Sequence, residues 1–235
     1  MRLHAGTSGF SYKEWKGTFY PEDLPAAGML RYYAERLSAV EINNTFYRMP
    51  RAAMLTAWAE QVPPGFVFVL KASQRITHQK RLKDAADNVA YFFNQAASLG
   101  DRLGPVLFQL PPNLKKDVPR LADFLTVLPE SARAAFEFRH ESWFDEETYG
   151  ALASSGAALC LAEDEDLATP LVATAGWGYA RLRRQDYTSG DLESRALQYR
   201  SQAWTDLFVF FKHEEGGRGP ALAADFTHLF AQAKG

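Results

Sequence analysis

The chain has 235 residues, of which 47% are hydrophobic and 23% charged, a composition typical of folded globular proteins. Its formal net charge of −2 gives no overall attraction to nucleic acid or to an anionic membrane, although it is compatible with a local basic patch. Cys160 is the single cysteine, which excludes an intrachain disulfide, and no stretch reaches the roughly 18–20 apolar residues of a membrane-spanning helix. With no apolar leader pattern, the sequence predicts a cytoplasmic protein without a membrane partner.

Short apolar, β-branched or aromatic runs alternate along the chain with longer segments of helical periodicity. The runs predict strands at residues 3–7, 39–43, 66–71, 105–110, 134–138, 157–161, 179–183 and 207–212. Apolar residues three or four positions apart predict helices between most of them. These stripes are Leu30, Tyr33 and Leu37; Met54, Trp58 and Val62; Val89, Phe92, Phe93 and Ala96; Leu121, Phe124, Leu125 and Leu128; and Leu222, Phe226, Leu229 and Phe230.

Helix start signals agree with two of the predicted helices. Asp117 precedes Val118-Pro119, and Asp145 is followed by two glutamates that suit a first helical turn. Residues 163–178 carry no clean helical stripe, so the sixth helix is predicted to be short or missing. Strands alternating with helices imply a parallel sheet, and eight of them in this length favour an α/β (β/α)8 TIM barrel, a single domain over residues 1–235.

Polar side chains recur at the carboxyl ends of the predicted strands, where the chemistry of such barrels is found. They are Glu41, Asn43, Lys71, His78, Gln109, Glu137, Arg139, His140, Glu163, Asp164, Arg181, Arg183, Lys212, His213 and Glu214. A structural explanation is an ion-pair network, in which Glu41 or Glu137 pairs with an arginine and closes the top of the barrel. Because burying charges carries a desolvation cost, their recurrence at one end of the barrel favours a functional site.

The residue types predict roles within this site. Glu41 and Glu137 lie inside apolar strands and are the candidates for acid/base catalysis, with His78 or His213 assisting. The predicted substrate-binding residues are the cations Lys71, Arg139 and Arg181, the amides Asn43 and Gln109, and the aromatic residues Trp15, Tyr47 and Trp143. The cations would bind a phosphate or carboxylate group. The aromatic side chains would form the floor of a pocket, or would simply pack the loops.

Several familiar signatures are missing from the sequence. It has no Walker loop, no Gly-x-Ser-x-Gly elbow and no His-Glu-x-x-His pair, and we find no motif for an organic cofactor. No spacing of Glu, Asp and His marks a metal site, although strand-end carboxylates could bind a divalent ion. The glycine-rich loop 214–220 begins with two glutamates, which favours a flexible surface turn over a phosphate-binding loop.

The same strand ends resemble the domain of unknown function 72 family, also called YecE-like. The matching segments are Gly6-Thr7-Ser8-Gly9-Phe10-Ser11-Tyr12, Trp15, Phe19-Tyr20-Pro21, Val40-Glu41-Ile42-Asn43-Asn44-Thr45-Phe46-Tyr47-Arg48, Phe68-Val69-Leu70-Lys71-Ala72, Ile76-Thr77-His78, Leu107-Phe108-Gln109-Leu110-Pro111-Pro112 and Phe136-Glu137-Phe138-Arg139-His140-Glu141-Ser142-Trp143. The resemblance covers the first two-thirds of the chain and implies a TIM barrel, but it implies little about chemistry. The last third departs from it, with Arg181-Leu182-Arg183-Arg184 where many members have Arg-x-His-Gly, and Lys212-His213-Glu214 where some have an Asn-rich stretch.

The leading functional hypothesis is an enzyme, a hydrolase or isomerase, acting on a small anionic molecule at the barrel mouth. One alternative is a nucleic-acid-binding or phosphodiester-cleaving barrel, with a metal held by Glu41, Glu137 and His78. In that case basic loop residues such as Lys80, Arg81 and Lys83 would bind the phosphate backbone. A third hypothesis is a barrel that binds a ligand without turnover. The sequence does not indicate an oligomeric state.

Overall fold

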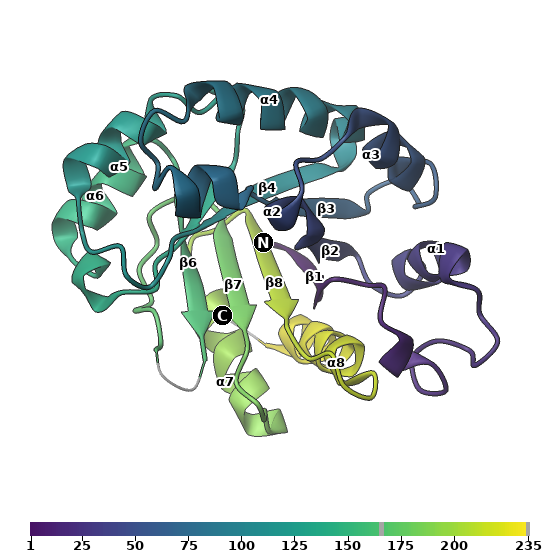
Figure 1. Cartoon of the computed structure of the whole chain (residues 1–235). Coiled ribbons are helices and arrows are strands. Elements are labelled where there is room, and N and C mark those ends of the chain that lie inside the picture. Colours follow the sequence, from purple (N-terminus) through teal and green to yellow (C-terminus); the bar gives the residue numbers. More distant parts are fainter. Residues whose placement is uncertain (165–166, 234–235) are drawn as a thin grey trace.

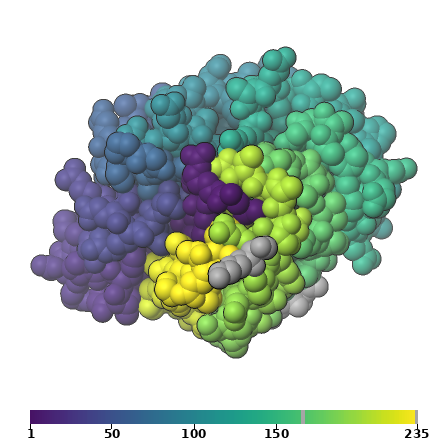
Figure 2. Space-filling view, turned by 180° about the vertical axis from the view of Figure 1, so that it is seen from behind, coloured from purple at the N-terminus to yellow at the C-terminus, as the bar shows by residue number. Residues whose placement is uncertain are grey.

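The strands of the computed structural model, which describes residues 1–164 and 167–233, form a closed parallel barrel in chain order. They are β1 (Arg2–Ser8), β2 (Ala39–Ile42), β3 (Val67–Lys71), β4 (Leu103–Gln109), β5 (Ala134–Glu137), β6 (Ala158–Glu163), β7 (Gly178–Leu182) and β8 (Asp206–Phe211). Pairing of β1 with β8 closes the ring. Figure 2 shows this closure on the outside of the molecule, where the purple amino-terminal residues lie beside the yellow-green segment that contains β8. The predicted TIM barrel is confirmed.

Helices surround the barrel (Figure 1). They are α1 (Met29–Ala34), α2 (Asn44–Tyr47), α3 (Ala52–Ala59), α4 (Ala86–Ala96), α5 (Val118–Leu125), α6 (Glu146–Ser154), α7 (Ser189–Arg200) and α8 (Arg218–Gln232). Both predicted start signals are confirmed, because the side chains of Asp117 and Asp145 accept backbone N–H bonds at the starts of α5 and α6. None of the helices in the described part of the chain is long and apolar enough to cross a membrane.

The segments on either side of β7 compare differently with the sequence prediction. No helix lies between β6 and β7 in the described residues 164 and 167–177, in agreement with the expected short or missing sixth helix. The helix α7, between β7 and β8, was not predicted. It begins with a capping box formed by Thr188 and Asp191 and buries Leu192, Ala196 and Tyr199. Its other positions are mostly polar, so the apolar stripe is too sparse to stand out.

The barrel strands separate two apolar cores, because successive side chains of a strand point to opposite faces. The outer core lies between strands and helices and includes Phe68, Phe108 and Phe136. The inner core fills the barrel with Ala39, Val69, Leu107, Ala135, Ala158, Cys160, Ala162, Trp177, Tyr179, Phe208 and Phe210. Two residues further along five strands, the inward positions hold Glu41, Lys71, Gln109, Glu137 and Arg181. The two-residue period therefore places a layer of polar groups on top of the apolar interior.

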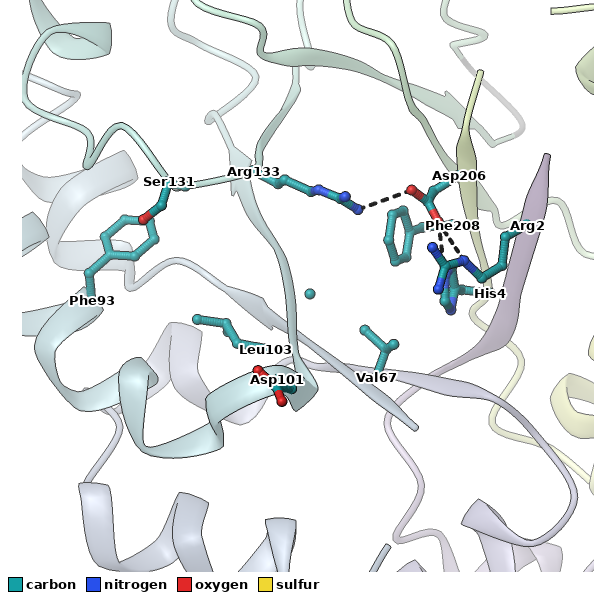
Figure 3. Close-up of a pocket in the computed structure, with 12 residues that line it drawn as sticks. Arg2, His4, Val67, Phe93, Asp101, Leu103, Ser131, Arg133, Asp206 and Phe208 are labelled. Carbon is teal, nitrogen blue, oxygen red and sulfur yellow. Dashed lines mark hydrogen bonds and ion pairs between the residues drawn. The ribbon is translucent and has the colours of Figure 1, made fainter. Parts of the chain in front are cut away.

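A second polar cluster lies at the amino-terminal end of the barrel, in a pocket of about 330 Å³ (Figure 3). Asp206 is nearly buried there, and its carboxylate lies 3.0 Å from Arg2 Nε, 3.4 Å from His4 Nε2 and 3.4 Å from an Arg133 nitrogen. The His4 ring stacks on Phe208 with a centroid separation of 4.6 Å. Burial lowers the pKa of His4, so this imidazole is neutral at pH 7. The cluster ties β1 to β8 where the barrel closes.

We expect Asp206→Asn to lower the free energy of unfolding by about 1–3 kcal/mol at pH 7, since it weakens hydrogen bonds to a charged acceptor. Burial alone would raise the pKa of Asp206, but the nearby arginines outweigh it and hold the pKa below its ordinary value of 3.8. The contribution is therefore present above pH 3.8 and is lost as the pH falls through the lower folded-state pKa. Urea denaturation at several pH values measures it. Arg133→Ala, which removes a half-exposed partner, should cost less than about 1 kcal/mol.

Candidate functional site

Arg181 lies at the centre of the polar layer and pairs with a glutamate from each of two strands. Its two terminal nitrogens lie 2.6 Å from Glu137 Oε2 and 2.8 Å from Glu41 Oε1. The Arg181 side chain is 2% exposed and neither glutamate is exposed at all. One guanidinium from β7 thus joins β2 and β5 inside the barrel. Such an ion pair is stable only when its remaining hydrogen-bonding groups are also satisfied.

The carboxylate of Glu41 is fully occupied by donors. Ser8 Oγ donates to Oε1 at 2.6 Å, and the Tyr179 hydroxyl donates to Oε2 at 2.6 Å, in addition to the bond from Arg181. Burial alone would raise the pKa of Glu41, but Arg181 and these hydrogen bonds outweigh it and hold the pKa below its ordinary value. Glu41 is therefore an ionised structural partner, and this placement argues against the expected proton-transfer role.

Glu137 accepts hydrogen bonds from three side chains and forms an ion pair with a fourth, Arg183. Besides Arg181 on Oε2, its Oε1 accepts from Gln109 Nε2 at 2.8 Å and lies 3.2 Å from a nitrogen of Arg139 and of Arg183. Burial would raise the pKa of Glu137, but Arg181 and Arg183 hold it well below its ordinary value. The expected acid/base role therefore does not fit this glutamate either. The network alternative describes both glutamates better.

Two further arginines extend the network from the buried layer toward solvent. Arg139 and Arg183 each place a nitrogen near Asp164 Oδ2, at 3.1 Å and 2.8 Å. The Arg139 side chain is 28% exposed and that of Arg183 is 12% exposed, so both present an edge to the barrel mouth. Each guanidinium has five N–H donors, and the pairs with Glu137 and Asp164 leave some of them free for a ligand.

Lys71 differs from these arginines because it has no carboxylate partner among residues 1–164 and 167–233. Its side-chain nitrogen donates to Gln109 Oε1 at 2.7 Å and lies 4.2 Å from the centre of the Phe46 ring. The residue is only 9% exposed. Burial, and next the charge of Arg181, lower its pKa to about 8. A lysine that is buried without an opposite charge is uncommon and costly unless it has a task.

A pocket of about 480 Å³, here called the mouth pocket, opens above this layer. It is lined by Tyr12, Asn43, Phe46, Tyr47, Lys71, His78, Gln109, Arg139, Arg181, Arg183, Lys212 and Glu214. Most of the expected substrate-binding residues meet here, whereas Glu41 and Glu137 lie beneath it. Lys212 follows β8, is exposed, and forms no ion pair with any residue that the structure describes. The pocket thus combines several cations with a wall of aromatic rings.

The two candidate histidines lie in different places. His78 lines the mouth pocket, where its Nδ1 lies 2.9 Å from Thr77 Oγ1 and its ring contacts the Phe46 ring edge-on. Burial, and next the charge of Lys71, lower its pKa, so its imidazole is neutral at pH 7. His213 lies in an adjoining pocket of about 520 Å³, with Nε2 2.7 Å from the Arg184 carbonyl oxygen. His78 is therefore the histidine close to Lys71.

The three aromatic candidates also lie in different places. Trp15 and Trp143 are both 1% exposed, and their indole N–H groups donate to the backbone carbonyls of Glu214 and Leu114. They pack the loops around the mouth and do not line the mouth pocket. Tyr47 does line it and is 72% exposed. The expectation of a tryptophan floor therefore does not fit the structure, whereas Tyr47 is free to contact a ligand.

The donor set proposed for a metal does not assemble. The oxygens of Glu41 and Glu137 are occupied by the donors described above, and His78 stands apart on the Phe46 ring. Over the described ranges, no group of three or more His, Cys, Asp or Glu residues could hold a metal ion. This geometry gives no support to the metal-dependent phosphodiesterase alternative.

Two further cations of the mouth pocket, Arg183 and Lys212, belong to the polar residues that the sequence places at strand ends, although it predicts no role for either. Arg183 and Lys212 are two residues beyond the inward-pointing Arg181 and Phe210, so the same alternation that places the polar layer could have assigned them. Phe46 lines the pocket as well; it follows the second strand and lies in the short helix α2, where no strand periodicity indicates the direction of a side chain.

Comparisons with known proteins agree with this fold. A family described as "Protein of unknown function DUF72" matches residues 4–235. The UPF0759 protein YecE of Escherichia coli is 33% identical over 116 residues, which are 49% of this chain and 43% of that protein. The UPF0759 protein YunF of Bacillus subtilis is 28% identical over 155 residues, 63% of this chain and 54% of that protein. The chain thus spans about half the length of the curated relatives it matches.

Two solved structures are similar over their whole length. A DUF72 family protein from Thermotoga maritima has a TM-score of 0.82 and 26% identity, covering 98% of this chain and 100% of that one. A DUF72 family protein from Enterococcus faecalis has a TM-score of 0.78 and 17% identity, covering 98% of both chains. At this low identity, the second similarity shows the fold alone.

Proposed function

We infer a function from the site itself, because this chain belongs to the DUF72 family, whose members share a description that names no activity. We propose an enzyme that uses acid/base chemistry on a small molecule bearing a phosphate or carboxylate, bound in the mouth pocket. The observation that carries this proposal is Lys71, a nearly buried lysine at the pocket wall with no carboxylate partner among the described residues.

A bound anion would complete the electrostatics of the mouth pocket. The glutamates below already offset Arg181, and Asp164 offsets Arg139 and Arg183. Lys71 and Lys212 form no ion pair with any described residue, although Glu214 lines the same pocket. An anionic group near Lys71 would satisfy its ammonium where water is partly excluded. Charge-assisted bonds of this kind are shorter and stronger than neutral ones. The free N–H groups of Arg139 and Arg183 would orient the bound anionic group.

Proton transfer in this proposal belongs to Lys71 and His78 rather than to the two glutamates. The pKa of Lys71 is lowered to about 8, which is close to a working pH near neutrality. The neutral imidazole of His78 contacts the Phe46 ring, which Lys71 also contacts. A group whose pKa lies near the operating pH is the most effective general acid or base. Hydrolysis or isomerisation of the anionic substrate is the reaction class that such a pair can serve.

We expect phosphate- or carboxylate-bearing metabolites to raise the melting temperature of the protein, and their uncharged analogues to leave it unchanged. A ligand at about 100 times its dissociation constant adds roughly 2.7 kcal/mol of stability. A thermal-shift screen of paired charged and uncharged compounds measures this. Lys71→Met should lose the shift, whereas Lys115→Met, the same change at an exposed lysine outside both pockets, should keep it. An unchanged shift in Lys71→Met would refute the proposal.

A further inference from the structure

The surroundings of Lys71 are those of an amine that can lose its proton and still reach a ligand. Its nitrogen makes one hydrogen bond, to the amide oxygen of Gln109, and that amide is held from the other side by Glu137. The nitrogen therefore has a fixed position at the pocket wall, beside the Phe46 ring. A lysine desolvated in this way, next to another cation, is the arrangement that makes a lysine nucleophilic.

We propose that Lys71 is a nucleophile that forms an imine with the carbonyl carbon of an anionic aldehyde or ketone bound in the mouth pocket. This inference rests on the proposed function and narrows it. The substrate class becomes a small molecule with a carbonyl group next to a carboxylate or phosphate. The exposed Lys212 and the free edges of Arg139 and Arg183 line the same pocket and would hold the anionic group.

The step balances without an added oxidant or reductant. The lone pair of the neutral Lys71 amine attacks the carbonyl carbon, and the carbonyl oxygen takes up a proton to give a carbinolamine. A second proton on that hydroxyl lets it leave as water while the C=N bond forms. The ammonium and the carbonyl compound thus become a protonated imine and one water. We assign these proton transfers to His78, because it lines the same pocket as Lys71 and is near enough for the charge of Lys71 to lower its pKa.

The charged groups around Lys71 come from most of the strands. They are Glu41 in β2, His78 beyond β3, Glu137 and Arg139 at and after the end of β5, Arg181 and Arg183 at and after the end of β7, and Lys212 and Glu214 after β8. Burial and Arg181 lower the Lys71 pKa to about 8, against the weaker opposing effect of the glutamates. A pKa about 2.5 units below the ordinary lysine value of 10.5 corresponds to a neutral fraction roughly 300-fold larger at pH 7.

The test is trapping with glyoxylate, an aldehyde that carries a carboxylate, followed by borohydride reduction of the full chain at pH 7. Reduction converts an imine into a stable secondary amine, so a trapped lysine carries a carboxymethyl group that peptide mass spectrometry locates. We expect the Lys71 label to exceed that of exposed lysines such as Lys115 by at least tenfold. The neutral amine fraction of Lys71 is roughly 300-fold larger, and the lower nucleophilicity of an amine with a lower pKa offsets part of this gain. Acetaldehyde, which has no anionic group, should show a much smaller preference.

Two controls make the outcome decisive. Lys71→Arg should lose the specific label and Lys115→Arg should keep it. If Lys71→Arg does not fold, inorganic phosphate provides a second control, because it should protect Lys71 in the wild-type protein. Label spread over the lysines in proportion to their exposure would overturn the inference. If phosphate raises the melting temperature while Lys71 stays unlabelled, only the imine fails. If no phosphate- or carboxylate-bearing compound stabilises the protein or protects Lys71, the proposed function fails as well.

Discussion

Replacing Arg181 by methionine is expected to lower the free energy of unfolding by about 3–5 kcal/mol, the range found when one partner of a buried ion pair is removed. Methionine fills similar space but leaves Glu41 and Glu137 buried without their shared cation. Urea denaturation followed by tryptophan fluorescence measures the loss. Arg218→Met removes an exposed pair with Asp186 and should cost less than about 1 kcal/mol.

The loss at Arg181 should also depend on pH. In the wild-type protein the pKa of both glutamates is held below the ordinary value of 4.5. Their contribution to stability is therefore present above pH 4.5 and is lost as the pH falls through their folded-state pKa. The gap between the wild type and Arg181→Met should accordingly narrow below pH 4.5. A gap that is small at pH 7, or that widens in acid, would contradict the ion-pair description.

Replacing Glu137 by glutamine is expected to cost about 3–5 kcal/mol as well, although it preserves the shape of the side chain. The carboxylate accepts hydrogen bonds from Gln109, Arg139 and Arg181 and pairs with Arg183. An amide would turn an N–H donor toward these groups. Chemical denaturation at pH 7 measures the change. A variant as stable as the wild type, or more stable, would return Glu137 to a catalytic role, because active sites often hold strain that folding does not need.

A double-mutant cycle tests whether the stability losses caused by the Arg181 and Glu137 substitutions depend on each other. If Arg181 and Glu137 form one network, the variant with both substitutions should lose less stability than the sum of the single variants. Coupling energies of 0.5–3 kcal/mol are usual for residues in one network, so we expect a value of at least about 1 kcal/mol. Additive losses would show that the two side chains act independently.

The barrel was predictable because its strands carry their own signal. Inward positions alternate with outward ones, so Glu41, Lys71 and Gln109 could be assigned to the interior from β2, β3 and β4 alone. The residues that pair with these side chains could not be predicted in this way. Arg181 reaches two glutamates from strands far away in sequence, and which side chains meet at one height depends on the tilt and stagger of the closed barrel.

Loop residues were harder to assign for a related reason. An indole N–H needs one acceptor, and a backbone carbonyl serves as well as a ligand does. Trp15 and Trp143 each found such a carbonyl from a loop distant in sequence. A similar limit applies to His213, which turns toward the Arg184 carbonyl in the adjoining pocket. Residue type indicated chemistry here, but only the packing of the loops decides whether a side chain faces solvent or core.

The most direct test of the central claim is a high-resolution crystal structure of the protein grown with inorganic phosphate. The account predicts a tetrahedral anion in the mouth pocket, with an oxygen at hydrogen-bonding distance, about 2.7–3.2 Å, from the Lys71 nitrogen and further contacts from Arg139 or Arg183. Glu41 and Glu137 should keep their bonds to Arg181 beneath it. Ordered water alone around Lys71, at phosphate concentrations in the millimolar range or above, would contradict the claim.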